Sequence, residues 1–257
     1  MEQLARARIA SWQGGSLWLL STAPVNDSPA PRTDFHAHHA VQIVVSLGGQ
    51  FRLWLADAEA QGPYVAVAPD VPHRFDAQGA YAILFVEPES RAGRAIVKAT
   101  FGDGDLRELA ESRFSGLAAQ LEHLAHAPAP STADLAVIGG QMVEALAGDD
   151  LQAPLDPRIQ AVVAWVAQDP DQRVTLDAAA RIAKLSASRL SHLFVEQTGL
   201  SFKTYLLWVR LTRAVVLMAE GDTLTAAAHG AGFADSAHFS RTFRRMFGIA
   251  PANLALV

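Results

Sequence analysis

The final hundred residues contain the same pattern of apolar, small and glycine residues twice, and this duplication restricts the possible folds more than any other feature. The matching residues are 48 positions apart at the start of the unit and 49 positions apart at its end. The pairs are Leu176 and Leu224, Ala180 and Ala228, Ala183 and Ala231, Leu190 and Phe239, Phe194 and Phe243, and Gly199 and Gly248. Each copy predicts a short helix, a tight turn and a second helix that ends at glycine. The pattern therefore predicts two helix-turn-helix units, the second with one more turn residue.

Polar residues mark where the helices of both copies begin. The predicted N-caps are Thr175 and Ser186 in the first copy, Thr223 and Asp235 in the second, and Ser201 before the helix between them. This intervening helix runs from Phe202 to about Ala219 and is roughly 27 Å long at ~1.5 Å per residue. A continuous helix makes a stiff spacer. Two recognition helices about one DNA turn apart, roughly 34 Å, can enter successive major grooves.

The second helix of each copy has a polar and basic outer face. The outward residues are Ser188, Arg189, Ser191 and His192 in the first copy, and Ser236, Ala237, His238, Arg241, Arg244 and Arg245 in the second. Small side chains let a helix approach the floor of the major groove, where Arg and His can donate hydrogen bonds to guanine. One amphipathic surface helix would show a similar pattern, but duplication about a rigid spacer favours DNA binding.

Composition and charge narrow the class of protein. Half of the 257 residues are hydrophobic and there is no cysteine, which predicts folded domains without disulfides or thiolate metal sites. No apolar run approaches ~20 residues and no signal peptide is evident, so we expect a cytoplasmic protein. Residues 158–257 hold eleven Lys and Arg against seven Asp and Glu, whereas residues 1–157 hold ten against nineteen. The C-terminal part is therefore the one that could face a polyanion.

The N-terminal part has the pattern of an antiparallel β-structure. Short apolar segments are separated by Pro, Gly and Asp, and the predicted strands are 16–21, 33–38, 40–47, 51–56, 64–68 and 81–86. Gly48 and Gly49 form a hairpin turn between two of them. Regularly spaced short strands of this kind are typical of an antiparallel barrel or sandwich.

After Pro88 the apolar period becomes helical. One stripe contains Phe114, Leu117, Leu121 and Leu124; another contains Leu135, Ile138, Met142 and Leu146; residues 128–131 separate them. We expect two antiparallel helices whose apolar faces either pack on the β-structure alone or form a dimer interface as well.

The polar segment 148–157 indicates a domain boundary. The predicted organisation is a domain at 1–150, a linker at 151–157 and a domain at 158–257, whose first helix has Asp156 as cap and Pro157 in its first turn.

The C-terminal residues resemble the AraC/XylS family of transcription regulators. The resemblance covers about a hundred residues and is carried by 190–194, 198–202, Tyr205, Arg210, Ala214, 232–245 and 247–251. It implies a seven-helix DNA-binding domain in which both recognition helices contact DNA, with base contacts from Ser188, Ser191, His192, Ser236, Ala237, His238 and Arg241. Lys184 stands in the first turn at a position where members of this family often have glycine. Ala252 to Ala255 replace the usual aromatic and Arg, which argues against a phosphate contact there.

Four polar residues of the N-terminal part form a candidate site. His36, His38 and Gln42 share strand parity, and His73 follows Pro72 on a later segment. The spacing resembles the metal site of cupins, except that Gln42 stands where a metal-binding cupin usually has Glu. We favour a ligand pocket over a metal site or a purely structural role, with Trp54 and Phe75 among the candidate apolar walls. A cupin-like effector-binding and dimerisation domain is also what the family resemblance implies.

The sequence therefore predicts a two-domain α+β protein with a cupin-like N-terminal antiparallel β-barrel, flanking helices and an all-α C-terminal domain. We expect a sequence-specific transcription regulator that senses a small molecule, needs no cofactor or metal, and is no enzyme. Its expected partners are double-stranded DNA, the small-molecule effector and a second copy of the chain, with RNA polymerase as a possible further partner. The alternatives are a metal-dependent cupin enzyme with a DNA-binding appendage, and a dimeric architectural DNA binder without effector.

Overall fold

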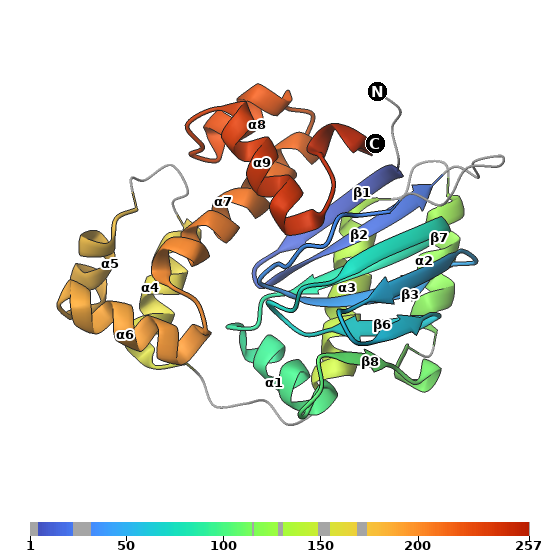
Figure 1. The fold of residues 1–257 in the computed structure, drawn as a ribbon, viewed down its shortest axis with the longest axis horizontal. Helices are drawn as coiled ribbons and strands as arrows, with labels where there is room; N and C mark the ends of the chain where they lie inside the picture. Colours follow the sequence, from blue (N-terminus) through green and yellow to red (C-terminus); the bar gives the residue numbers. More distant parts are fainter. Residues whose placement is uncertain are drawn as a thin grey trace. The chain divides into compact units, whose positions relative to one another are not determined.

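The chain divides into two units in the computed structural model, which describes residues 5–22, 32–114, 116–127, 131–148, 155–168 and 174–256 (Figure 1). One unit comprises Met1–Leu151 together with Ser240–Val257, and the other comprises Gln152–Phe239. The end of the chain is thus grouped with the N-terminal unit. Most of the predicted linker lies outside the described residues. Among the described helices, none is both long and apolar enough to cross a membrane.

The first unit is built on strands that form two connected layers. They are β1 (Ala5–Trp12), β2 (Gly15–Thr22), β3 (Val41–Ser46), β4 (Gln50–Trp54), β5 (Glu59–Gln61), β6 (Tyr64–Val67), β7 (Arg74–Val86), β8 (Leu106–Glu108) and β9 (Leu254–Leu256). The larger sheet has the order β8-β6-β3-β7-β2-β1-β9, and β4 joins β5 to the first half of β7. All pairings are antiparallel except that β9 lies parallel to β1.

Strand β7 explains why this β-structure differs from the predicted barrel. Its residues 74–78 pair with β4, whereas residues 79–86 pair with β2, and Gly79 has φ 85° where the pairing changes. A left-handed φ is readily available to glycine. The strand therefore passes from one layer to the other. Strands β8 and β9 lie at opposite ends of the larger sheet and do not pair with each other in the described part of the chain. The two-domain α+β fold is confirmed, but the barrel is not closed.

Helices cover one face of the larger sheet. They are α1 (Arg91–Thr100), α2 (Leu117–His126) and α3 (Thr132–Ala147), with a 3-10 turn at Glu111–Phe114 (Figure 1). Alternate strand residues such as Leu17, Ile43 and Leu84 are fully buried against Ile96 and Met142 of this layer. The period of two places Trp18, Gln42 and Phe85 on the opposite face. That face carries the candidate ligand site.

Some local predictions for this unit were incomplete. The predicted strand at 33–38 is wrong, because this segment makes only isolated bridges, from Arg32 to Asp76 and from His36 to His73. The other five predicted strands are present with shifted ends. Helix α1 and strands β1, β5, β8 and β9 were not predicted.

The helical unit contains the first predicted motif and the beginning of the second. Its helices are α4 (Pro157–Gln168), α5 (Leu176–Ala183), α6 (Ala187–Thr198), α7 (Phe202–Ala219) and α8 (Leu224–Gly230), and it holds the start of α9 (Ser236–Phe247). The spacer helix α7 has the predicted bounds. Each predicted N-cap residue accepts a backbone N–H in the first turn, as Ser186 does from Arg189 and Asp235 does from His238.

Candidate DNA-binding and ligand sites

Helix α6 is held by its apolar face and presents a polar face to solvent. Leu190, Leu193 and Phe194 are buried in a core shared with α4, α5 and the start of α7. Ser188, Arg189 and His192 are exposed and Ser191 is half-buried. The turn before this helix contains Lys184 with φ 53° and ψ 42°, the left-handed conformation that its glycine-like position suggested. The four predicted DNA contacts therefore lie together on an accessible surface.

Helix α9 has the same construction with a stronger positive charge. Phe239 and Phe243 are fully buried, while Ala237, Arg241, Arg244 and Arg245 are exposed. The other two predicted contacts, Ser236 and His238, are half-buried, and the His238 ring packs edge-on against Phe233 at 5.2 Å. Gly232 has φ 80° at the position equivalent to Lys184. The second turn is therefore built with glycine where the first accepts lysine.

The C-terminal end of α9 is fastened to the N-terminal sheet. The Nη2 and Nε atoms of Arg244 lie 2.8 and 2.9 Å from Oδ2 of Asp34, and the Asp34 backbone N–H donates to the Gly248 carbonyl at 2.8 Å. The Phe247 ring packs 5.2 Å from the Trp18 ring. One of the predicted DNA contacts, Arg244, is thus already engaged by a carboxylate.

Beside this attachment, three histidines form a buried cluster. His36, His38 and His73 are 7%, 2% and 1% exposed, and one ring nitrogen of each lies within 4.8 Å of the others. Burial, together with the neighbouring His73, lowers the pKa of His36 to about 3 and holds the pKa of His38 well below its usual value. Burial also lowers the pKa of His73. The three imidazoles are therefore neutral at neutral pH.

Gln42 completes this group, and Oε1 of its amide lies 2.9 Å from Nε2 of His38.

His39 points away from the cluster and contacts two carboxylates instead. Its ring lies between Asp70 at 2.9 Å and the buried Glu89 at 3.2 Å. Burial alone would lower the pKa of His39, but hydrogen bonds to these carboxylates outweigh burial and raise it to about 9. His39 is accordingly a charged partner in the fold.

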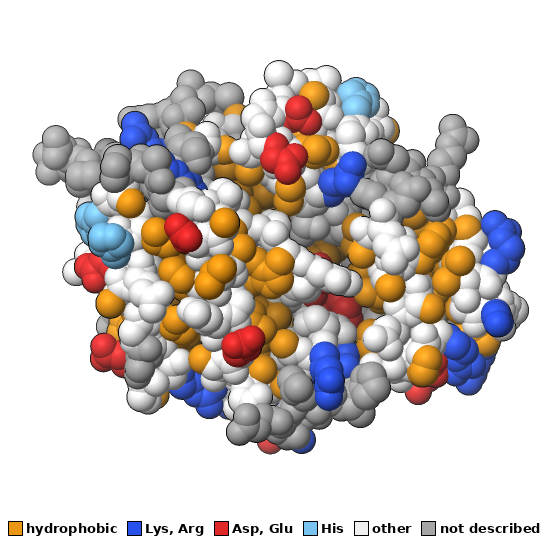
Figure 2. Space-filling model, turned by 180° about the vertical axis from the view of Figure 1, so that it is seen from behind, with side chains coloured by type: hydrophobic (Ala, Val, Ile, Leu, Met, Phe, Trp, Pro, Cys, Tyr) orange, Lys and Arg blue, Asp and Glu red, His pale blue; other side chains and the backbone are white. Residues whose placement is uncertain are grey.

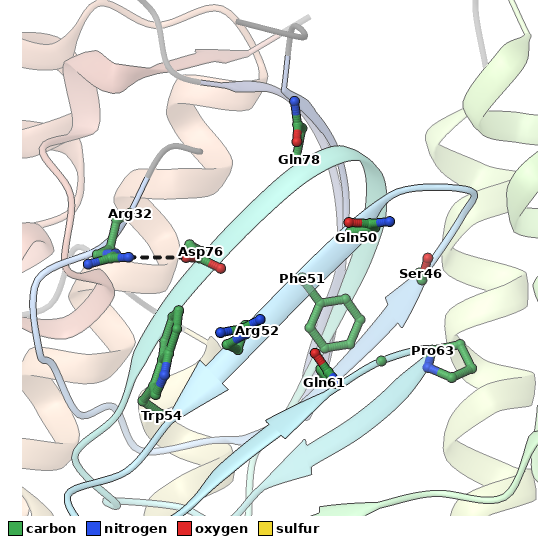
Figure 3. Close-up of a pocket in the computed structure, with 11 residues that line it drawn as sticks. Arg32, Ser46, Gln50, Phe51, Arg52, Trp54, Gln61, Pro63, Asp76 and Gln78 are labelled. Atoms are coloured by element: carbon green, nitrogen blue, oxygen red, sulfur yellow. Dashed lines mark ion pairs between the residues drawn. The ribbon is translucent and has the colours of Figure 1, made fainter. Parts of the chain in front are cut away.

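An open pocket of about 590 Å³ lies over β4 (Figure 3). Its lining is mostly polar and consists of Arg32, Ser46, Gln50, Phe51, Arg52, Trp54, Gln61, Gly62, Pro63, Asp76 and Gln78. Arg52 and Trp54 stand side by side in Figure 3, and the Arg52 guanidinium lies 5.7 Å from the Trp54 ring centroid. Arg32 pairs with Asp76 at 3.5 Å. The pocket offers cationic, amide and aromatic groups to a small molecule.

The six predicted effector residues therefore occupy different places. His36, His38, Gln42 and His73 lie together in the buried cluster, and Trp54 lines the open pocket. Phe75 is packed between Phe51 and Tyr81, at 5.8 and 5.3 Å, and does not line that pocket. Sequence reasoning missed Gln50 and Arg52. Their shared parity with Trp54 on one strand was the available signal.

A shallow apolar groove runs between α2 and α3. Its lining residues are Ala119, Gln120, His123, Leu124, Asp134, Val137 and Ile138, and Val137 is 60% exposed. In Figure 2, which shows the molecule from behind, orange side chains form several groups among charged ones on the visible face. Hydrophobic groups that remain exposed in this way often mark an interface.

Comparisons with known proteins agree with the duplicated motif. A helix-turn-helix domain family matches residues 179–255. The transcriptional activator RhaS of Escherichia coli K12 is 33% identical over 129 residues, which are 49% of this chain and 46% of RhaS. The chain thus matches about half the length of these curated relatives.

Solved structures extend the similarity to nearly the whole fold. ToxT from Vibrio cholerae aligns over 93% of this chain and 95% of its own, with a TM-score of 0.55 and 14% identity. A ToxT structure with bound unsaturated fatty acid aligns over 93% and 94%, with a TM-score of 0.55 and 13% identity. The similarity in fold therefore includes both the sheet and the helices of this chain. The family match thus covers the helix-turn-helix residues 179–255, and ToxT is similar to this chain in fold over most of its length.

Proposed function

We propose that this protein is a sequence-specific DNA-binding transcription regulator. The observation that carries the proposal is the pair of equivalent helices, α6 and α9, each anchored by buried Leu or Phe and each exposing short polar and basic residues. Helices of this kind enter the major groove and donate to base edges. The RhaS relatives are named as activators, so activation is the output that we assign.

A footprint on promoter DNA tests this function directly. The full chain at physiological salt should protect two adjacent major grooves per subunit, and specific sites should bind at least ~1,000-fold more tightly than random DNA. Random DNA of the same length is the matched control. Protection that does not differ between the two would exclude sequence-specific regulation.

We further propose that the pocket over β4 binds the small-molecule effector. Arg52 presents a guanidinium beside the Trp54 ring, and Gln50, Gln61 and Gln78 supply amide groups around them. A guanidinium binds carboxylates in a bidentate manner, and Trp gives an apolar surface. This chemistry fits an organic acid. The fatty acid in the ToxT structure is a ligand of the same charge in a protein of the same fold.

Calorimetric titration of the full chain with aromatic and aliphatic carboxylates tests the effector site. Binding should be lost in Arg52→Ala and retained in Arg113→Ala, an exposed arginine outside the pocket. Uncharged sugars are the second control. If sugars bind and carboxylates do not, the assignment of an organic acid is wrong.

A second copy of the chain is the partner that we propose for the α2 and α3 groove. Val137 projects from this groove with 60% of its surface exposed, and a dimer would cover it. Sedimentation of the full chain should show a dimer that Val137→Glu dissociates, because a buried carboxylate without a partner opposes association. A monomer in the unmodified protein would refute this assignment.

A further inference from the structure

The His36, His38 and His73 cluster has an arrangement that an organic ligand does not require. Nδ1 of His36 lies 2.8 Å from the Asp34 carbonyl, and Nδ1 of His73 lies 2.8 Å from the Val71 carbonyl. A carbonyl can only accept, so both Nδ1 atoms carry the proton. The lone pair of each ring is therefore on Nε2.

These lone pairs are directed into the cluster, where two acceptors cannot satisfy each other. The ring centroids of His36 and His73 are 4.3 Å apart, and those of His38 and His73 are 5.0 Å apart. Nε2 of His73 is buried and has no hydrogen-bond partner among the described residues. An unsatisfied buried acceptor costs about 1–3 kcal/mol. A group that accepts electron pairs would remove this cost.

A metal ion is such a group, and the surroundings of the rings suit one. Histidines that bind metals usually donate their second ring N–H to a carbonyl or carboxylate, which fixes the tautomer and the ring orientation. His36 and His73 already make these bonds. Oε1 of Gln42 adds an amide oxygen beside His38.

We propose that His36, His38 and His73 bind one late first-row transition-metal ion, with Gln42 beside them. In the described part of the chain, the cluster contains neither a carboxylate nor a thiolate. Imidazole nitrogens suit Zn²⁺, Ni²⁺ and Cu²⁺, whereas Mg²⁺ and Ca²⁺ prefer carboxylate and carbonyl oxygens. The spacing of these residues alone favours an organic ligand. The two donated Nδ1 hydrogens and the unsatisfied Nε2 of His73 change that assignment.

Zinc titration of the full chain tests the proposal. The protein is stripped with EDTA, exchanged into chelator-free buffer and titrated with Zn²⁺ by calorimetry, and the bound metal is counted by mass spectrometry. One Zn²⁺ per chain is expected. His36→Ala and His73→Ala should each weaken binding by more than the ~10–100-fold typical of losing an outer-sphere partner. Mg²⁺ should not compete.

The chain contains nine histidines, so a matched control is needed. His123→Ala removes an exposed histidine of α2 and should leave the stoichiometry and affinity unchanged. Circular dichroism of each variant in EDTA establishes that it is folded. Should His73→Ala fail to fold, the ¹⁵N resonances of the unmodified protein decide, because Zn²⁺ must shift the His36 and His73 Nε2 signals. Zinc binding that persists unchanged in both cluster variants, or shifts confined to exposed histidines, would overturn the site.

Discussion

Lys184 has a positive φ in the turn between α5 and α6, where a side chain has a steric cost. Its φ of 53° and ψ of 42° place it in the left-handed region, which costs about 1–2 kcal/mol for a residue with a Cβ. Lys184→Gly removes this cost but adds about 0.5–1 kcal/mol of chain entropy. We expect a net gain of about 0.5–1 kcal/mol in the free energy of unfolding, measured by urea denaturation.

The control for this change is Lys184→Ala, which removes the charge and keeps the Cβ. It should give no comparable gain, because the steric cost is unchanged. Equal stabilisation by alanine and glycine would show that the lysine charge, rather than the backbone conformation, limits stability at this turn.

His39 and Glu89 form a buried ion pair. Variants of the two residues can separate the contribution of this pair to the free energy of unfolding from the contribution of side-chain packing. Both side chains are at most 3% exposed, and Nε2 of His39 lies 3.2 Å from Oε2 of Glu89. His39→Ala leaves the carboxylate buried without this partner, so we expect a loss of about 3–5 kcal/mol in the free energy of unfolding at pH 7. Thermal or urea unfolding of the full chain measures it.

The double variant with Glu89→Ala provides the internal control. When both partners are removed, no charge is left unpaired, so the double variant should be less destabilised than the sum of the two single variants. Strict additivity would mean that the two side chains contribute independently. The exposed His126→Ala should have little effect.

Among the helices, α9 offers the sharpest test of base recognition. Arg241 is exposed on its outer face, one turn from the helix start, and has no ion pair among the described residues. If Arg241 donates to a guanine, Arg241→Ala should reduce discrimination between the preferred and a mismatched site by about 1–3 kcal/mol. Competitive binding assays on the two DNA duplexes measure this difference.

Arg113→Ala is the matched control, because it removes one exposed positive charge from the N-terminal unit. It should change neither affinity nor discrimination beyond a small uniform effect. A loss in Arg241→Ala that is the same on all sequences, with a smaller salt dependence, would instead assign Arg241 to a phosphate.

Local chemistry explains which elements could be predicted from the sequence. Helix α7 has its predicted bounds because Ser201 caps it and its apolar residues recur at helical spacing. Helix α1 was missed because its apolar face is short, consists mainly of alanines around Ile96, and is interrupted by Gly93. A Cβ at Gly93 would lie 2.0 Å from the Glu87 carbonyl oxygen, so close packing rather than propensity sets this residue. Strand β9 was missed because its partner, β1, lies about 250 residues away in the sequence.

The two candidate sites also differ in how far the sequence predicts them. The parity of His36, His38 and Gln42 predicted a common side, and these residues do lie together, because residues on one short extended segment alternate regularly. The pocket over β4 depends on Arg52 facing Asp76 across two strands, and nothing local specifies that pairing. Long-range register therefore limited the prediction of the pocket.

In the molecule as a whole, segment 33–36 connects the histidine cluster to the end of the second recognition helix. Asp34 accepts from the His36 ring through its carbonyl and from Arg244 through its side chain, and Gly248 packs so closely that a Cβ there would lie 2.6 Å from Nδ1 of His36. A change at the cluster would therefore reach α9 through very few contacts. Binding at the cluster and binding of DNA by α9 are expected to influence each other.

The Asp34 and Arg244 pair makes this competition measurable. Asp34 occupies Nε and Nη2 of Arg244, so DNA can bind these two atoms only if the pair is first broken. The two side chains are 64% and 59% exposed, and exposed pairs contribute about 0.2–1 kcal/mol. Asp34→Ala should therefore raise DNA affinity by no more than about fivefold, and Asp34→Asn should show part of this gain. In the Arg244→Ala background, Asp34→Ala should have no effect, because the competing contact is already absent. An increase that persists in that background would mean that Asp34 acts on DNA by general repulsion of phosphate rather than by holding Arg244.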